Sequence, residues 1–194
     1  MSLGYRLSKS LAHIACLSPI AWLVYAAYNR LLGGDPQEKM LHELGLWTLI
    51  YLLLGLSVTP LRTIFNLNIL LKFRRMLGLY AAFYLSLHIT VFFYFYLESD
   101  ISFLWQEIVE RPYVTVGMLA TLLIIPLVLT STRFMQKKLG RRWKTLHKAV
   151  YAISALGITH FIWQSKSDLN EPLWYFIWLV FLLGFRYYEK VSKA

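Results

Sequence analysis

The chain carries five histidines, and most of them fall inside or at the edge of strongly apolar segments. The histidines in apolar surroundings are His13, His88, His147 and His160. An ionisable side chain in such a segment costs free energy and indicates a functional site, although a neutral imidazole can also simply hydrogen-bond a neighbouring helix. Imidazole is also a common axial ligand of haem iron. Several such histidines in one chain favour the ligand interpretation.

The four histidines fall at two depths within their apolar segments. At a helical rise of about 1.5 Å per residue, His88 lies roughly 18 Å and His160 roughly 21 Å from the start of its segment. His13 and His147 both lie close to segment starts. If these segments all run outward through a membrane, His88 pairs with His160 in the outer half and His13 with His147 at the inner edge. A helix bundle can hold a macrocycle between facing histidines, so one or two haems are expected.

Composition places these histidines in a membrane protein. Of the 194 residues, 58% are hydrophobic and only 15% are charged, whereas soluble domains are about 45–50% apolar and about 25% charged. Hydrocarbon requires backbone hydrogen bonds within each segment, so the spans must be helices. The expected fold is an all-α bundle of six transmembrane helices that forms a single domain over residues 1–194. The expected spans are residues 11–28, 45–61, 76–97, 113–131, 146–164 and 172–187.

The 20 Lys and Arg residues are distributed unevenly between the connections. Most lie at the two chain ends, in residues 62–75 and in residues 132–145, whereas nearly all of the 10 acidic residues lie in the remaining connections. Short loops rich in Lys and Arg stay in the cytoplasm. Both termini are therefore expected to be cytoplasmic. Topology explains the formal net charge of +10, so nucleic-acid binding is not expected. The acidic connections hold only a few basic residues, which are Arg30, Lys39, Arg111 and Lys166.

Further candidate contacts lie at the expected cytoplasmic face. Arg74, Arg75, Arg141 and Arg142 could pair with haem propionates or with a flavin phosphate, although topology alone explains any one of them equally well. The sequence has no Walker motif, no GxGxxG and no nucleophile elbow. NAD(P)H bound by this chain itself is therefore not expected. The single cysteine excludes an intramolecular disulfide and a cysteine-ligated cluster.

Two features belong to the expected outer side. His42 stands beside Glu43 at the start of the second span and is interpreted as a helix-start or interfacial residue. The amphipathic segment ISFLWQEIVE, residues 101–110, is expected either as a short helix on the membrane surface or as an ordinary loop with one or two helical turns. We find no internal repeat in the sequence, and no connection is long enough to house a soluble domain.

Several motifs resemble those of one protein family. They are TSTRFMQKKLGRRWKTLHKAVY at 130–151, RRMLGL at 74–79 followed by LHIT at 87–90, RPY at 111–113 and GDP at 34–36. Together they look like the MsrQ (YedZ) family, the membrane subunits of the bacterial periplasmic methionine sulfoxide reductase system. That family belongs to the wider ferric-reductase-like transmembrane family. The resemblance covers nearly the whole chain, including its length and its six expected spans.

The resemblance implies a haem b subunit of the bacterial inner membrane that transfers electrons and is not itself the catalytic subunit. Electrons would come from the quinone pool or from a cytosolic flavin reductase. They would pass to a periplasmic molybdopterin enzyme of the MsrP type, which repairs proteins by reducing methionine sulfoxide. FMN is implied as a second cofactor. His88 and His160 match the paired haem histidines of the family, and His147 matches a further one.

The chain departs from the wider ferric-reductase pattern at one position. That pattern has two histidines on the third span, and Arg75 stands where the first of them is expected. His13 is then the candidate partner of His147, on depth alone. Two alternatives stay open. One is a ferric or quinone-linked reductase that serves another outer acceptor, and the other is a non-redox scaffold or transporter subunit whose histidines only contact neighbouring helices.

Overall fold

The computed structural model describes residues 3–165 and 168–192, so Lys166 and Lys193 lie outside the described residues. The all-α prediction is confirmed for the described part of the chain. The long helices are α1 (Leu3–Tyr28), α2 (Pro36–Phe65), α3 (Leu71–Phe95), α5 (Pro112–Leu129), α8 (Ala149–Gln164) and α9 (Asn170–Val191). The short elements are the 3₁₀ turns Asn68–Leu70 and Ile101–Phe103 and the helices α4 (Leu104–Glu110), α6 (Arg133–Leu139) and α7 (Arg141–Leu146).

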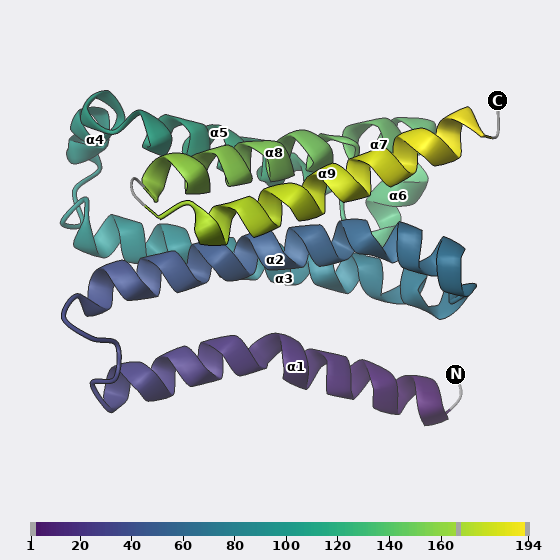
Figure 1. Cartoon of the computed structure of the whole chain (residues 1–194), viewed down its shortest axis with the longest axis horizontal. Coiled ribbons are helices and arrows are strands. Elements are labelled where there is room, and N and C mark those ends of the chain that lie inside the picture. The colour runs from purple at the N-terminus through teal and green to yellow at the C-terminus, as the bar shows by residue number, and fades with distance from the viewer. Residues whose placement is uncertain (1–2, 166–167, 193–194) are drawn as a thin grey trace.

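The long helices lie side by side in one bundle (Figure 1). Helix α4 lies at one end of this bundle, and α6 and α7 lie at the other, where α1 begins and α9 ends. We call these the α4 end and the α6–α7 end. Helix α2 is the centre of the packing, because it contacts α1, α3, α8 and α9. In the most apolar 18-residue stretch of α2, 56% is buried, compared with 11% in the corresponding stretch of Asn68–Phe95.

Among the described residues, four helical stretches are long and apolar enough to cross a membrane, and they correspond to the first four predicted spans. They are Gly4–Tyr28, Pro36–Phe65, Asn68–Phe95 and Pro112–Leu129. The fifth and sixth predicted spans correspond to α8 and α9, which also pack against α2. Helix α8 has only 16 residues, because Leu146 ends α7 and does not begin the span. Helix α9 is long but carries Arg186 and Lys190 in its last turns.

The GDP motif explains why α2 begins well before the predicted span. The Asp35 side chain accepts hydrogen bonds from the N–H groups of Gln37 and Glu38, at 3.1 and 2.9 Å. Pro36 occupies the first turn, where a missing N–H costs nothing. The helix ends at Asn66, which adopts the left-handed conformation (φ 54°) typical of a helix end. The additional turns carry the start of α2 out to the α4 end.

The amphipathic segment 101–110 folds as a 3₁₀ turn followed by the seven-residue helix α4. This fits both a short surface helix and a loop with one or two helical turns, and its place on a membrane surface stays a prediction. Asp100 caps this segment by accepting a hydrogen bond from the Ser102 N–H at 2.8 Å. That hydrogen bond lowers the pKa of the Asp100 carboxyl below its ordinary value.

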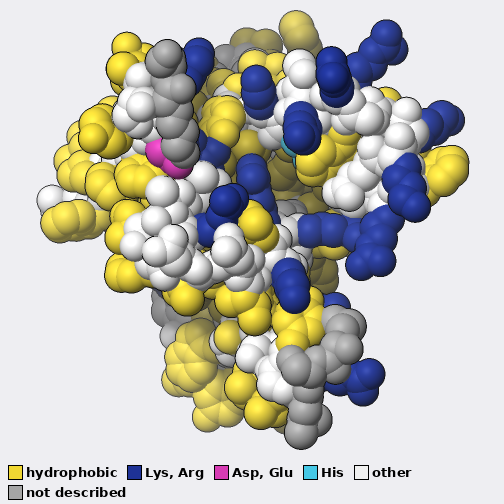
Figure 2. Space-filling view, turned by 90° about the vertical axis from the view of Figure 1, so that its right-hand side faces the viewer, with side chains coloured by type: hydrophobic (Ala, Val, Ile, Leu, Met, Phe, Trp, Pro, Cys, Tyr) yellow, Lys and Arg dark blue, Asp and Glu magenta, His cyan; other side chains and the backbone are white. Residues whose placement is uncertain are grey.

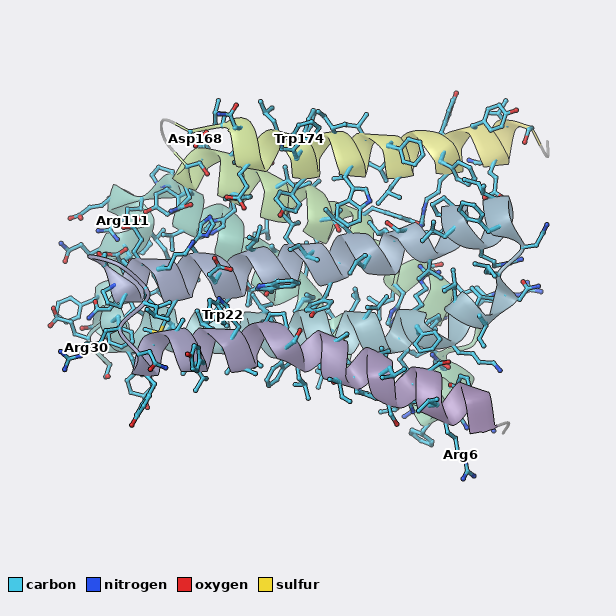
Figure 3. All side chains as sticks on the ribbon, turned by 60° about the horizontal axis from the view of Figure 1, so that its bottom comes forward. Arg6, Trp22, Arg30, Arg111, Asp168 and Trp174 are labelled. Carbon is cyan, nitrogen blue, oxygen red and sulfur yellow. The ribbon has the colours of Figure 1, made fainter. Side chains whose placement is uncertain are left out.

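The charges separate along the bundle axis. Lys and Arg side chains spread over the α6–α7 end, which faces the viewer in Figure 2. Arg6 lies at that end as well, whereas Arg30, Arg111 and Asp168 lie at the α4 end (Figure 3). The two ends therefore have the charge difference that the sequence predicts for the two sides of a membrane.

Two buried tyrosines bind α1 to the α2–α3 pair. The Tyr84 hydroxyl donates to the Cys16 carbonyl at 2.9 Å and accepts from the Ile20 N–H at 3.1 Å. The Tyr51 hydroxyl donates to the same carbonyl at 3.1 Å. Both tyrosines are almost fully buried, at 0% and 3% exposure. Because polar groups in an apolar interior must find partners, these phenols fix the position of α1.

Replacing Tyr84 with phenylalanine is expected to loosen α1. The Ile20 N–H and the Cys16 carbonyl then each lose a hydrogen bond to the Tyr84 hydroxyl, and a lost hydrogen bond costs about 0.5–1.5 kcal/mol. Cys16 is the single cysteine of the chain and is 5% exposed, so its alkylation rate reports on α1. We expect Cys16 of Tyr84→Phe to react about tenfold faster than wild type. Tyr94→Phe is the control, because Tyr94 is 60% exposed on the same helix. Equal rates in both variants would contradict this role.

Candidate functional site

A cavity of about 590 Å³ lies between α2, α3, α5 and α8 and extends to the α4 end. This volume is within the range of small-molecule and cofactor sites, which is about 300–1,000 Å³. Most of the lining residues are apolar, such as Leu49, Leu52 and Ile153. Histidines 88 and 160 also line the cavity. The cavity therefore combines an apolar wall with a few polar groups, as cofactor sites do.

His88 and His160 face each other across this cavity. Their ring centroids are 6.5 Å apart and their ring planes are almost perpendicular, at 86°. His88 comes from α3 and His160 from α8, so residues far apart in the sequence meet at one level of the bundle. The structure thus brings together the two histidines that the sequence analysis had paired by depth.

Each of these rings is held by a backbone carbonyl. The Nδ1 atom of His88 lies 2.9 Å from the Leu41 carbonyl oxygen, and that of His160 lies 2.7 Å from the Tyr113 carbonyl oxygen. A carbonyl oxygen can only accept, so Nδ1 must carry the proton in both rings. In the neutral imidazole this leaves the lone pair on Nε2 available. Metal-binding histidines are oriented in the same way, by a hydrogen bond from the second ring nitrogen.

Two glycines make these contacts sterically possible. A Cβ atom at Gly117 would lie 2.9 Å from Nδ1 of His160, and one at Gly45 would lie 3.1 Å from Nδ1 of His88. Each glycine comes one helical turn after the residue whose carbonyl accepts the hydrogen bond. Helical side chains lean toward the N-terminus, so a side chain at this position would cover that carbonyl. Glycine exposes the carbonyl and gives the ring room to lie against the helix.

The two histidine sites are built in the same way in two helix pairs, α2 with α3 and α5 with α8. In both pairs the histidine follows the accepting residue by 47 positions. The corresponding residues are Leu41, Gly45 and His88 in the first pair and Tyr113, Gly117 and His160 in the second. The two helix pairs therefore share this local arrangement around the histidine. At the same constant offset, Arg75 corresponds to His147 and Lys39 to Arg111.

The two inner histidines have separate partners. His147 follows α7, stacks on Trp143 with ring centroids 4.0 Å apart, and places Nε2 3.0 Å from the Thr130 hydroxyl. His13 on α1 places Nδ1 2.8 Å from the Tyr80 hydroxyl on α3. The pairing of His13 with His147 stays a prediction.

The four arginine candidates lie away from the outer cavity. Arg74 and Arg75 lie near the start of α3, and Arg141 and Arg142 begin α7. None of these four arginines is among the described residues that line the cavity. Arg74 precedes His88 by 14 residues on one helix, a rise of roughly 21 Å. These arginines are therefore placed to serve a group at the α6–α7 end.

The structure adds two arginines that sequence reasoning did not select for the interior. Arg186 of α9 donates to the Leu56 carbonyl at 2.7 Å and to the Tyr151 hydroxyl, and so joins α9 to α2 and α8. Arg111 lines the cavity at the α4 end. From the sequence alone, one cannot tell whether an Arg in the last turns of an apolar helix, or before a proline, points into the bundle or away from it.

His42 lies at the edge of the cavity. Its Nε2 atom is 3.7 Å from a Glu171 carboxylate oxygen, and its ring packs on the edge of Phe161 at a centroid distance of 5.4 Å. This fits the interfacial role expected from the sequence.

Fold and site together define a helical membrane protein with a paired-histidine cavity. The family described as ferric reductase like transmembrane component matches residues 41–158 of this chain. That match includes His88 and most of α2, α3, α5 and α8, and it ends two residues before His160. No solved structure matches the chain.

Curated relatives are similar over nearly the full length. The chain is 43% identical to the protein-methionine-sulfoxide reductase heme-binding subunit MsrQ of Xanthomonas euvesicatoria, over 95% of this chain and 88% of the relative. It is 42% identical to MsrQ of Xanthomonas campestris, with the same coverage, and 40% identical to MsrQ of Polaromonas naphthalenivorans, over 96% of this chain and 87% of the relative. The chain therefore belongs to the ferric-reductase-like transmembrane family and, within it, to the MsrQ family.

Replacing Gly117 with alanine is expected to destabilise the protein. The added Cβ would lie 2.9 Å from Nδ1 of His160, and such overpacking typically costs about 1–3 kcal/mol. Gly78→Ala is the matched control, because no atom lies within 4 Å of its Cβ position. Thermal unfolding in detergent, followed by circular dichroism, should give a lower midpoint for Gly117→Ala than for Gly78→Ala. The opposite order would show that the His160 ring has room to move.

Proposed function

We propose that this chain binds haem b in the outer cavity, with His88 and His160 as axial ligands. The facing rings are the observation that carries this proposal. A metal–imidazole bond is about 2 Å long, so two imidazoles on opposite sides of one metal have ring centres roughly 6 Å apart. The centroids of His88 and His160 are 6.5 Å apart. The related MsrQ proteins are named heme-binding subunits, which supports the same ligand.

The residues of the chain have three tasks in this proposal. The Leu41 and Tyr113 carbonyls hold the protons on Nδ1 and so keep Nε2 free to bind iron. Gly45 and Gly117 let the rings approach their supporting helices. The apolar wall excludes water. Bound haem would supply one-electron redox chemistry, whose potential depends on the axial ligands and on the dielectric around them.

We further propose that the chain carries electrons across the bacterial inner membrane to a periplasmic reductase. The charge separation between the bundle ends supports an orientation with the α6–α7 end in the cytoplasm, which requires α8 and α9 to cross as the fifth and sixth spans. Quinol or a cytosolic flavin reductase would donate the electrons. The acceptor would be a molybdopterin methionine sulfoxide reductase of the MsrP type. The relatives' name, subunit of a methionine sulfoxide reductase, supports this partner.

The inner candidates belong to the same proposal. A second haem would use His147 together with His13, and FMN would place its phosphate near the arginines of the α6–α7 end. Arg74 and Arg75 of α3 and Arg141 and Arg142 of α7 supply that charge. Both inner histidines already bond a hydroxyl through one ring nitrogen.

His88→Ala and His160→Ala are each expected to abolish the bis-histidine haem spectrum of the purified protein. Each change removes one axial ligand, whereas His42→Ala keeps both and should retain the spectrum. We would compare wild type and the three variants by absorption spectra of the oxidised and reduced proteins and by the amount of haem per chain. A variant at position 88 or 160 with unchanged haem content and spectrum would refute the ligand assignment. Wild type without a Soret band would refute haem binding altogether.

His13→Ala is expected to leave the outer haem unchanged and to affect only an inner site. The reason is that His13 and Tyr80 bond each other outside the outer cavity. Iron stoichiometry and low-temperature EPR of the purified variant make the measurement. If both match wild type, His13 is not a haem ligand.

A further inference from the structure

The mouth of the outer cavity carries very few charged groups. Among the described residues that line the cavity, Glu38 is the one carboxylate and Arg111 is the one Lys or Arg. Both lie near the α4 end, and Figure 3 shows Arg111 there, at the opposite end of the bundle from Arg6. A ligand with acidic groups can therefore find a counter-charge in this cavity only from Arg111.

Two helices fix the position of Arg111. It is the last residue before Pro112 begins α5, and its backbone N–H donates to the Glu107 carbonyl of α4 at 2.9 Å. Its Nη1 atom also lies 2.9 Å from a Glu107 carboxylate oxygen, and its guanidinium lies over the Tyr96 ring at 5.9 Å from the centroid. Tyr113, whose carbonyl holds His160, follows two residues later. Arg111 thus lies immediately before the first turn of α5, which contains the carbonyl that orients His160.

Haem b carries acidic groups that could pair with Arg111. Haem b carries two propionates, and an anion in an apolar cavity is costly unless it is paired and hydrogen-bonded. A guanidinium has five N–H donors in a planar fork that matches a carboxylate. The bond from Nη1 to Glu107 uses only part of this capacity. Glu38 would repel a propionate, so the Arg111 side of the mouth is the favourable one.

We propose that Arg111 binds a haem propionate, so that the propionate edge of the haem points toward the α4 end. This inference rests on the proposed function, because it concerns the same cavity. It assigns the propionate contact to the outer mouth, whereas the arginines considered from sequence lie at the α6–α7 end. It also fixes the orientation of the macrocycle within the bundle.

Lys39 provides a matched comparison. It occupies the position of α2 that corresponds to Arg111 in the second helix pair. Lys39 also pairs with a nearby carboxylate, that of Glu43, at 2.9 Å. It lines a smaller neighbouring pocket together with Asp35 and His42, and not the large cavity. Removing either cation changes the charge of the α4 end equally, but only Arg111 is placed to reach a ligand in the cavity.

The test compares haem with its dimethyl ester, in which both propionates are neutral. The full-length apo-protein is loaded with either compound, and haem loss to excess apomyoglobin is timed. Arg111→Gln removes a charge-assisted hydrogen bond, so it is expected to lose haem at least about tenfold faster than wild type. With the dimethyl ester, Arg111→Gln and wild type are expected to release the ligand at the same rate.

Two further variants separate binding from structure. Lys39→Gln is expected to match wild type with both compounds, and Arg111→Lys to recover part of the lost retention. The proposal is overturned if Arg111→Gln behaves like Lys39→Gln, or if the effect persists with the ester. Failure of wild type to bind haem would instead overturn the proposed function itself.

Discussion

The site depends on two hydrogen bonds, one from each facing histidine to the carbonyl of a neighbouring helix. The bond from His88 joins α3 to α2, and the bond from His160 joins α8 to α5. Each bond fixes the orientation of a ring and the nitrogen that carries its proton. Both depend in turn on a glycine one turn further along, since any side chain there would meet the imidazole. In each helix pair, this one hydrogen bond therefore sets the packing of the two helices, the tautomer of the histidine and the geometry of the cavity.

The membrane environment explains why several buried polar side chains form hydrogen bonds to groups on other helices. In hydrocarbon an unpaired donor or acceptor is costly, so buried phenols and arginines bond backbone groups on other helices. Tyr84 does this between α3 and α1, and Arg186 does it between α9 and α2. These contacts hold α1 on α3 and α9 on α2, which leaves α2, α3, α5 and α8 to form the cavity. The charged residues gather at the bundle ends, where the proposed electron donor and acceptor would approach.

Composition and charge were sufficient to predict the helical class, the first four spans and the segregation of charge. Depth along the helices was sufficient to pair His88 with His160. The support of these rings could not be predicted, because Gly45 and Gly117 resemble any other glycine in an apolar helix. The equivalence of the two helix pairs was also hidden, since few residues other than the glycine and the histidine are shared between them. The start of α8 was misplaced because Leu146 continues an apolar pattern while the backbone ends a helix there.

The most direct test of the central claim is an experimental structure of the protein purified with its haem. The account predicts a single porphyrin in the cavity between α2, α3, α5 and α8, with iron bound by Nε2 of His88 and Nε2 of His160. Both Nδ1 atoms should remain bonded to the carbonyls of Leu41 and Tyr113. A cavity filled only by lipid or detergent, or an iron bound through Nδ1 of either histidine, would contradict it.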